Sequence, residues 1–162
     1  MSGPKYAKVD PADYGRLRRY KYIAKKGRNC FYAQILEPKV TAGKNLPMHM
    51  HQEILEVPKG MVVDHINHDG MDNRSANLRA ATKAQNSRNR KKFLKSDGSK
   101  QSKYKGVSWH KKTDKWMAAI TFNTKHIYLG LFDNDIDAAK AYDEASKKYH
   151  GEFGRLNFPE PF

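Results

Sequence analysis

Cysteine and long hydrophobic runs are almost missing from this sequence. Cys30 is the only cysteine in 162 residues, which excludes a disulfide within the chain and a zinc site built on several thiolates. No run of about 18 apolar residues occurs, and the start, MSGPKYAKVDPADYGRLRRYKY, lacks the apolar core of a secretory signal. We therefore expect a soluble, cytoplasmic protein without a membrane partner.

Acidic residues are also few, since 17 Asp and Glu stand against 31 Lys and Arg, a formal net charge of +14. Such a field attracts polyanions, so nucleic acid is the first partner to consider. Eleven of the basic residues lie between Lys83 and Lys112, against the single acid Asp97. The alternative is a solvated basic surface, as on small ribosome-associated proteins, and only the arrangement of the residues can decide.

The chain has room for two small α+β units, the first a short lead-in followed by a compact ββα-like unit. Its expected elements are a strand at 6–10, a helix from Pro11 to 22, a strand at 30–36, a strand ending at Asp64 and His65, and a helix at 83–95. Thr82 and Gln85 match a capping box before that last helix, which would place Asn86 and Arg90 one turn apart on one face.

Residues 95–103 are polar and contain Gly and Ser, which predicts a flexible basic linker between residues 1–94 and 104–162. After it, segments of strand character at 104–109, 116–122 and 126–132 predict a three-stranded antiparallel sheet. The segment 136–151 predicts one helix that packs its alanines on the sheet and ends at Gly151.

The stretch VDHINHDGMDNRSANLRAATKAQN, residues 63–86, gathers acid, imidazole and carboxamide side chains beside a loop. Cleavage of a phosphodiester needs an activated water, a cation that neutralises charge, and groups that hold both in line. His65 can be the general base, because an imidazole of ordinary pKa, about 6.5, is largely neutral at working pH. Asp64 and the amide oxygen of Asn86 suit a Mg²⁺ shell, while Asn77 can bond the loop and orient His65. Each of these residue types also has an ordinary structural use in turns.

The sequence VDHINHDGMDNRSANLRAATKAQNSRNR, residues 63–90, resembles the HNH endonuclease motif of phage homing endonucleases. The resemblance implies that Asp64 and Asn86 hold one divalent metal ion, that His65 is the general base and that Asn77 positions it. The ion would be Mg²⁺, with Mn²⁺ as the alternative, and the setting would be a bacterial or phage-infected cell. Upstream, MHMHQEIL aligns His51 with a histidine of the family, as a supporting residue, and has Gln52 where Arg is frequent.

Residues 104–159 resemble the plant APETALA/ERF-type DNA-binding domain. The resemblance rests on Tyr104-x-Gly106-Val107, Trp116-x-Ala118, Tyr128-Leu129-Gly130-x-Phe132, Ala138-Ala139-x-Ala141-Tyr142-Asp143 and Leu156-Asn157-Phe158-Pro159. The plant domain reads DNA with arginines and tryptophans on its sheet, whereas the matching positions here are Lys105, Ser108, His110, Thr121, His126 and Tyr128. Arg is the side chain best suited to bidentate contact with guanine, so we do not expect the plant site preference to carry over.

We expect DNA contacts from this sheet and from the basic segment that precedes it. The candidates are Arg88, Arg90, Lys91, Lys105, His110, Trp116, Thr121, His126 and Tyr128. For the aromatic residues among them, packing in the core of a small sheet and helix unit is the alternative role.

Together these features predict a metal-dependent HNH endonuclease of the homing type, targeted to double-stranded DNA by its C-terminal domain. One active site acts on one strand at a time, so we expect nicking by a monomer. The first alternative is a sequence-specific DNA-binding regulator with an inactive HNH unit. An RNA-binding basic protein is a further alternative, although it would leave the 63–86 motif without a role.

Overall fold

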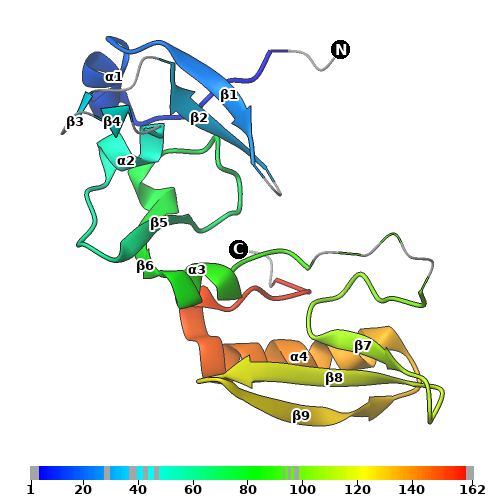
Figure 1. Ribbon diagram of the computed structural model, residues 1–162. Helices are drawn as coiled ribbons and strands as arrows, with labels where there is room; N and C mark the ends of the chain where they lie inside the picture. The colour runs from blue at the N-terminus through cyan, green and yellow to red at the C-terminus, as the bar shows by residue number, and fades with distance from the viewer. Residues whose placement is uncertain are drawn as a thin grey trace. The chain divides into compact units, whose positions relative to one another are not determined.

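The computed structural model describes residues 4–27, 30–36, 40–41, 44–45, 48–92, 94, 96 and 99–159. The chain divides into two compact units, Met1–Asn86 and Ser87–Phe162, whose elements are shown in Figure 1. This division falls ahead of the linker expected at 95–103, and the flexible character of that linker stays a prediction. Within the described residues, no helix combines the length and the apolar character needed to cross a membrane.

The first unit begins with helix α1 (Pro11–Leu17), which has proline in its first turn as predicted. The helix is shorter than expected, because Tyr22 begins strand β1 (Tyr22–Lys26) and does not end the helix. Gly15 and the β-formers after Leu17 disfavour a longer helix. Strand β2 (Phe31–Ile35) confirms the strand expected at 30–36 and pairs with β1 in an antiparallel hairpin.

The strand expected at 6–10 is wrong, because this segment makes a single bridge and no ladder. Lys8 N–H donates to the Met71 carbonyl and Asn73 N–H donates to the Lys8 carbonyl, each at 2.8 Å. The extended N-terminal segment is therefore used to hold the loop around residue 72. The short strands β3 (Val40–Thr41) and β4 (Lys44–Asn45) form a small hairpin of their own.

A small core joins the lead-in to helix α2 (Met50–Ile54). Leu17, Ala33 and Met50 are buried together, with Tyr22 and Met71 among the side chains packed on them. The loop that follows His65 is thus anchored on the lead-in through Met71. The lead-in consequently forms part of the support of the candidate site.

Strand β5 (Met61–His65) confirms the strand that ends at the Asp-His pair. It pairs in an antiparallel hairpin with β6 (Leu78–Thr82), which the sequence did not reveal. A turn of 3-10 helix, η1 (Ser75–Asn77), leads into β6, and α3 (Lys83–Arg88) follows it.

The capping box of α3 is confirmed, but the predicted length of the helix is wrong. Thr82 N–H donates to Gln85 Oε1 at 2.8 Å, and Gln85 N–H donates to Thr82 Oγ1 at 3.2 Å. The helix ends at Arg88, so Arg90 does not lie one turn above Asn86. Ser87 and Asn89 favour the end of the helix, because side chains of these types compete with the helix for backbone hydrogen bonds. Asn89 is buried just beyond this end.

The second unit confirms the predicted antiparallel sheet, in the order β7 (Val107–His110), β8 (Lys115–Phe122) and β9 (Lys125–Phe132). The turn between β8 and β9 consists of Asn123 and Thr124, both at positive φ (47° and 65°). Such two-residue turns match the twist of the strands that they join. The pairing of β8 with β9 shifts between Ala118 and Ala119, which is a bulge.

Helix α4 (Asp135–His150) lies along one face of this sheet (Figure 1). Asn134 caps its start by accepting from Asp137 N–H at 2.8 Å, and Gly151 at φ 55° ends it, as expected. Ala138 and Ala139 are fully buried against Val107 and Ala118, so the small side chains do bring the helix close to the sheet. The turn η2 (Gly151–Phe153) follows.

Two further contacts close the second unit. Gly106, at φ 76°, lies so close to Tyr142 that there is no room for a Cβ atom. The buried carboxylate of Asp143 accepts from Asn157 N–H, Asn157 Nδ2 and Phe158 N–H at 2.8 to 3.0 Å. Asn157 in turn accepts from Lys105 N–H at 2.7 Å and donates to the Lys105 carbonyl at 3.1 Å. The end of the chain is thereby tied to the segment leading into β7.

Candidate functional site

Asp64 and His65 end strand β5, and both are buried. Arg79, opposite Asp64 in the hairpin, donates from Nε and Nη2 to Asp64 Oδ2 at 3.0 and 2.9 Å. Asp64 is 3% exposed and His65 is 7% exposed. Neighbouring residues of a strand project to opposite faces, so the carboxylate and the imidazole leave β5 on different sides.

Asn73 fixes the tautomer of His65. Its side-chain nitrogen donates to the Met71 carbonyl at 3.2 Å, which turns Oδ1 toward His65 Nε2 at 3.3 Å. Because an amide oxygen only accepts, Nε2 carries the proton in the neutral ring and Nδ1 carries none. Burial lowers the pKa of His65, opposed in part by the Asn73 hydrogen bond and the Asp64 charge. The lowered pKa keeps the ring mostly neutral at pH 7.

Aromatic rings enclose the imidazole of His65. The ring of Tyr32 lies 5.9 Å from it and that of His51 lies edge-on at 5.0 Å, measured between centroids. His49 stacks on His51 at 5.2 Å. Burial, together with the smaller electrostatic effects of His65 and His49, lowers the pKa of His51 to about 3. The structure thus brings the expected supporting residue His51 to His65, as a neutral ring.

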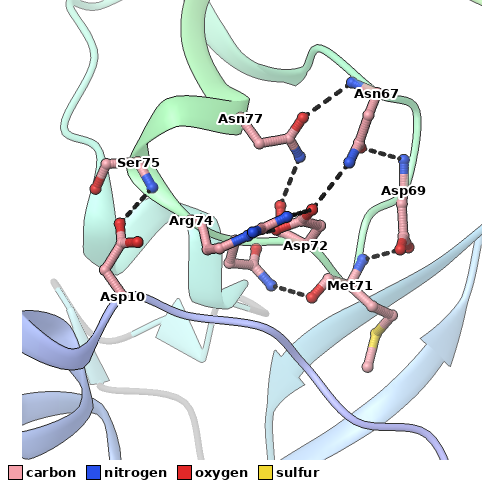
Figure 2. Close-up of polar contacts among 9 residues, drawn as sticks. Asp10, Asn67, Asp69, Met71, Asp72, Arg74, Ser75 and Asn77 are labelled. Atoms are coloured by element: carbon pink, nitrogen blue, oxygen red, sulfur yellow. Dashed lines mark hydrogen bonds and ion pairs between the residues drawn. The ribbon is translucent and has the colours of Figure 1, made fainter.

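Asn77 holds the loop that follows His65, as Figure 2 shows. Its Oδ1 accepts from Asn67 N–H at 2.9 Å, and its Nδ2 donates to the Asp72 carbonyl at 2.7 Å. Its backbone carbonyl accepts from Ile66 N–H at 2.9 Å. Asn77 therefore binds the two residues after His65, whereas Asn73 reaches the ring itself.

Asp72 is the centre of the same loop network (Figure 2). Its buried carboxylate accepts from Arg74 at 2.7 and 2.8 Å and from Asn67 Nδ2 at 2.9 Å. The Arg74 hydrogen bonds lower the pKa of Asp72 to about 2. Asp10, from the end of the N-terminal segment, accepts from Ser75 N–H at 2.7 Å. The loop is thus stabilised by the Arg74–Asp72 ion pair within it and by Asp10 from the N-terminal segment.

Asp64 and Asn86 are the expected metal ligands. Asn86 is half-buried on α3, and Asp64 ends β5. Within the part of the chain that the structure describes, no group of three His, Cys, Asp or Glu side chains could hold a metal ion. One carboxylate and one amide oxygen suit a hard ion such as Mg²⁺, which keeps several waters and also binds substrate phosphate. By residue type, these two donors therefore suit such an ion.

Three residues that contact Asp64 or His65 were not predicted as site residues. Tyr32 comes from the distant strand β2, and no local pattern points to it. Arg79 follows from the β5–β6 register, which requires strand β6 to be recognised first. Asn73 lies in a turn rich in Asp and Asn, where its type alone predicts a bond to the local backbone.

The second unit presents an outer sheet face, on the side away from α4. His110, Thr121, His126 and Tyr128 lie on it, and Tyr128 is 60% exposed. The ring nitrogen Nδ1 of His126 lies 3.0 Å from Thr121 Oγ1, and that of His110 lies 2.8 Å from Thr113 Oγ1. Both imidazoles are therefore held in fixed orientations on this face.

The other expected DNA contacts lie elsewhere. Trp116 packs against the core beneath the sheet and meets Trp109 edge-on at 4.9 Å. Lys105 turns its ammonium onto the carbonyls of Arg88 and Arg90, and burial lowers its pKa to about 8. Arg88 lies over the Phe122 ring at 5.6 Å, whereas Arg90 and Lys91 are exposed. Of the expected DNA contacts, only Arg90, Lys91 and the four residues of the outer sheet face are open to a partner.

Comparison with known proteins finds two families. The HNH endonuclease model matches residues 56–88, and the AP2 domain model matches residues 102–152. Among curated proteins, an AP2-like ethylene-responsive transcription factor, TOE2 of Arabidopsis thaliana, is 40% identical over 68 residues, 42% of this chain and 14% of its own length. APETALA2-like protein 2 of Oryza sativa subsp. indica is 38% identical over 68 residues, 42% of this chain and 16% of its own length. The chain thus spans about one seventh of the length of these relatives, and it contains both an HNH endonuclease domain and an AP2 domain.

Proposed function

We propose that this protein is a metal-dependent DNA endonuclease of the HNH homing type, with β5, β6 and α3 as its ββα unit. The observation that carries the proposal is the buried His65, which Asn73 holds as the neutral Nε2–H tautomer. This arrangement is what a general base requires, because Nδ1 can then accept a proton from water. It lies within the segment that matches the HNH endonuclease model.

The surrounding residues supply positioning and charge. Asp64 and Asn86 would hold one Mg²⁺ or Mn²⁺ ion, which when bound neutralises charge on the phosphate and the leaving oxygen. Asn77 and Asn73 fix the loop and the ring, so that the base does not need to reorient. Tyr32 and His51 exclude water from one side of the imidazole and thereby keep it neutral.

The AP2 domain would bind double-stranded DNA through the outer sheet face. A sheet of three strands fits a major groove of about 12 Å, and His110, His126 and Tyr128 stand on the face that would enter it. Arg90, Lys91 and the net charge of +14 would add contacts with phosphate. With one catalytic unit per chain, we propose that a monomer nicks one strand, in the bacterial or phage-infected cell that the homing type implies.

The test compares wild type with His65→Ala on supercoiled plasmid DNA, with Mg²⁺ or EDTA, and separates open-circular from linear product on a gel. His68→Asn is the matched control, because it removes an imidazole three residues away and Asn tolerates the positive φ of 65° there. We expect Mg²⁺-dependent nicking that His65→Ala reduces by about 10²–10⁴-fold and His68→Asn preserves. Binding to DNA, measured in EDTA by gel shift, should be equal in all three proteins.

One observation favours the alternative of a DNA-binding regulator with an inactive HNH unit. The carboxylate expected to hold the ion is engaged by Arg79, as in a purely structural ion pair. Binding of DNA without metal-dependent cleavage by the wild type would support that alternative and contradict the nuclease proposal. Arg79→Ala distinguishes the nuclease from the inactive regulator further. It releases the Asp64 carboxylate, so in a nuclease the metal concentration needed for nicking would change.

A further inference from the structure

The AP2-containing unit has a pocket at the β7 edge of its sheet. It has a volume of about 730 Å³ and lies beside strand β7, between Trp109 and the segment 99–101. Lys92, Lys100 and Lys111 line it together with the indole of Trp109, and Ser108 and Gln101 add polar groups. A pocket of this size takes a ligand of small-molecule dimensions.

The charge of the pocket points to an anionic ligand. Three lysines contribute to its lining, and none of the described lining residues is acidic. The ammonium of Lys92 is already oriented, because it donates to the Val107 carbonyl. Lysines grouped without a carboxylate attract phosphate oxygens, which accept hydrogen bonds and neutralise the charge.

The aromatic wall points to a flat group. The Nζ atom of Lys100 lies 3.0 Å from the centre of the Trp109 ring, over one of its faces. Trp116 meets Trp109 edge-on, and so supports the indole from the protein side. An exposed ammonium on an indole is held more weakly than a stacked base, so a base can take the place of Lys100. The displaced ammonium would then be released toward phosphate.

We propose that this pocket binds one unpaired nucleotide of a DNA strand, with its base stacked on Trp109 and its phosphate among Lys92, Lys100 and Lys111. In a duplex the base faces are covered by their neighbours and only the edges are accessible, so a ring face inside a pocket selects an unpaired base. The inference deepens the proposed DNA-binding function and rests on it. The pocket would give the AP2-containing unit a second contact with DNA, made to a DNA strand that is unpaired or that ends near the bound site.

Tryptophan fluorescence of the full chain tests this inference. Trp109 and Trp116 are the only tryptophans, so Trp116→Phe leaves Trp109 as the sole emitter. We expect a twelve-residue oligothymidylate to quench this emission. In the same background, Lys100→Ala and Lys111→Ala should each weaken binding at least about fivefold and reduce the slope of log affinity against log salt by about 0.7. Lys140→Ala, an exposed lysine on α4, is the charge-matched control and should change neither quantity.

Unchanged emission, or wild-type affinity of both lysine variants, would overturn the inference. So would tighter binding of oligouridylate than of oligothymidylate, since the occupant would then be RNA. A blunt duplex titrated in parallel separates the two proposals. If the duplex binds and the oligothymidylate does not, the pocket assignment fails and the DNA-binding function stands. If only the oligothymidylate binds, the pocket assignment stands and the duplex function fails.

Discussion

Gly106→Ala tests how closely α4 must approach the sheet. Gly106 has a φ of 76°, and a Cβ atom there would lie 1.8 Å from Tyr142 Cδ2 and 2.3 Å from Cε2. The left-handed conformation costs an alanine about 1–2 kcal/mol. Forcing a methyl group into a packed core costs about 1–3 kcal/mol more. Tyr142 is 3% exposed and has little room to move, so we expect a loss of about 2–5 kcal/mol in the free energy of unfolding of this unit.

The assay is urea unfolding followed by tryptophan fluorescence, because both tryptophans belong to the second unit and report on it alone. Gly151→Ala is the matched control. It also has a positive φ, 55°, but no described heavy atom lies within 4 Å of its added Cβ. Its ψ of −138° lies in a region that other residues rarely adopt, so we expect this control to lose only the backbone part, about 1–3 kcal/mol. Equal losses in the two variants would refute the steric argument, since the contact with Tyr142 would then contribute nothing.

Three further predictions concern the site and the closure of the second unit. Asn73→Ala should lower the nicking rate by about 10–100-fold at unchanged DNA affinity, because His65 loses the acceptor that orients its ring. Equal single-turnover nicking rates of the variant and the wild type would contradict this. Asn157→Ala should cost about 1–3 kcal/mol in tryptophan-detected unfolding, because buried Asp143 loses the Nδ2 donor of Asn157 and Lys105 N–H loses its acceptor, and an unchanged midpoint would refute it. Asp72 has a pKa lowered from 3.8 to about 2, so it stabilises the fold above pH about 4 and that stabilisation is lost as the pH falls toward 2. Arg74→Ala should therefore move acid unfolding, followed by circular dichroism, to higher pH, and an identical titration would argue against the ion pair.

The sequence predicted those elements whose signals are local. Pro11, the β-branched residues before Asp64 and the alanine spacing of α4 act within a few residues. Strand β5 and helix α4 lie where expected, and α1 begins where expected although it ends early. Strand β6 was not found, because its alanines have little strand propensity and the pairing with β5 decides its conformation. Helix α3 was predicted too long for the opposite reason, since lysines and arginines beyond Arg88 suit a helix that the fold does not continue.

In the candidate site too, features set by local sequence could be predicted and features set by the folded chain could not. The positions of Asp64, His65 and Asn77 relative to the strand and the loop follow from spacing, because a strand end and a turn place them. The contact of Asn73 with the imidazole could not be predicted from spacing, since two asparagines of one loop are equivalent until the chain is folded. On the sheet, alternation separates two faces, but it does not say which face α4 covers, and Trp116 lies on the covered one.

The tie between Lys105 and Asn157 has a consequence for the origin of this chain. The two residues stand 52 positions apart, yet they join the places where the polypeptide enters and leaves the AP2 fold. A fold whose ends adjoin can be inserted into a surface loop, or attached to an unrelated protein, without stretching its host. Gene fusion could therefore transfer this fold as a complete folding unit. The plant proteins, which are several times longer, carry a similar segment over about one seventh of their length.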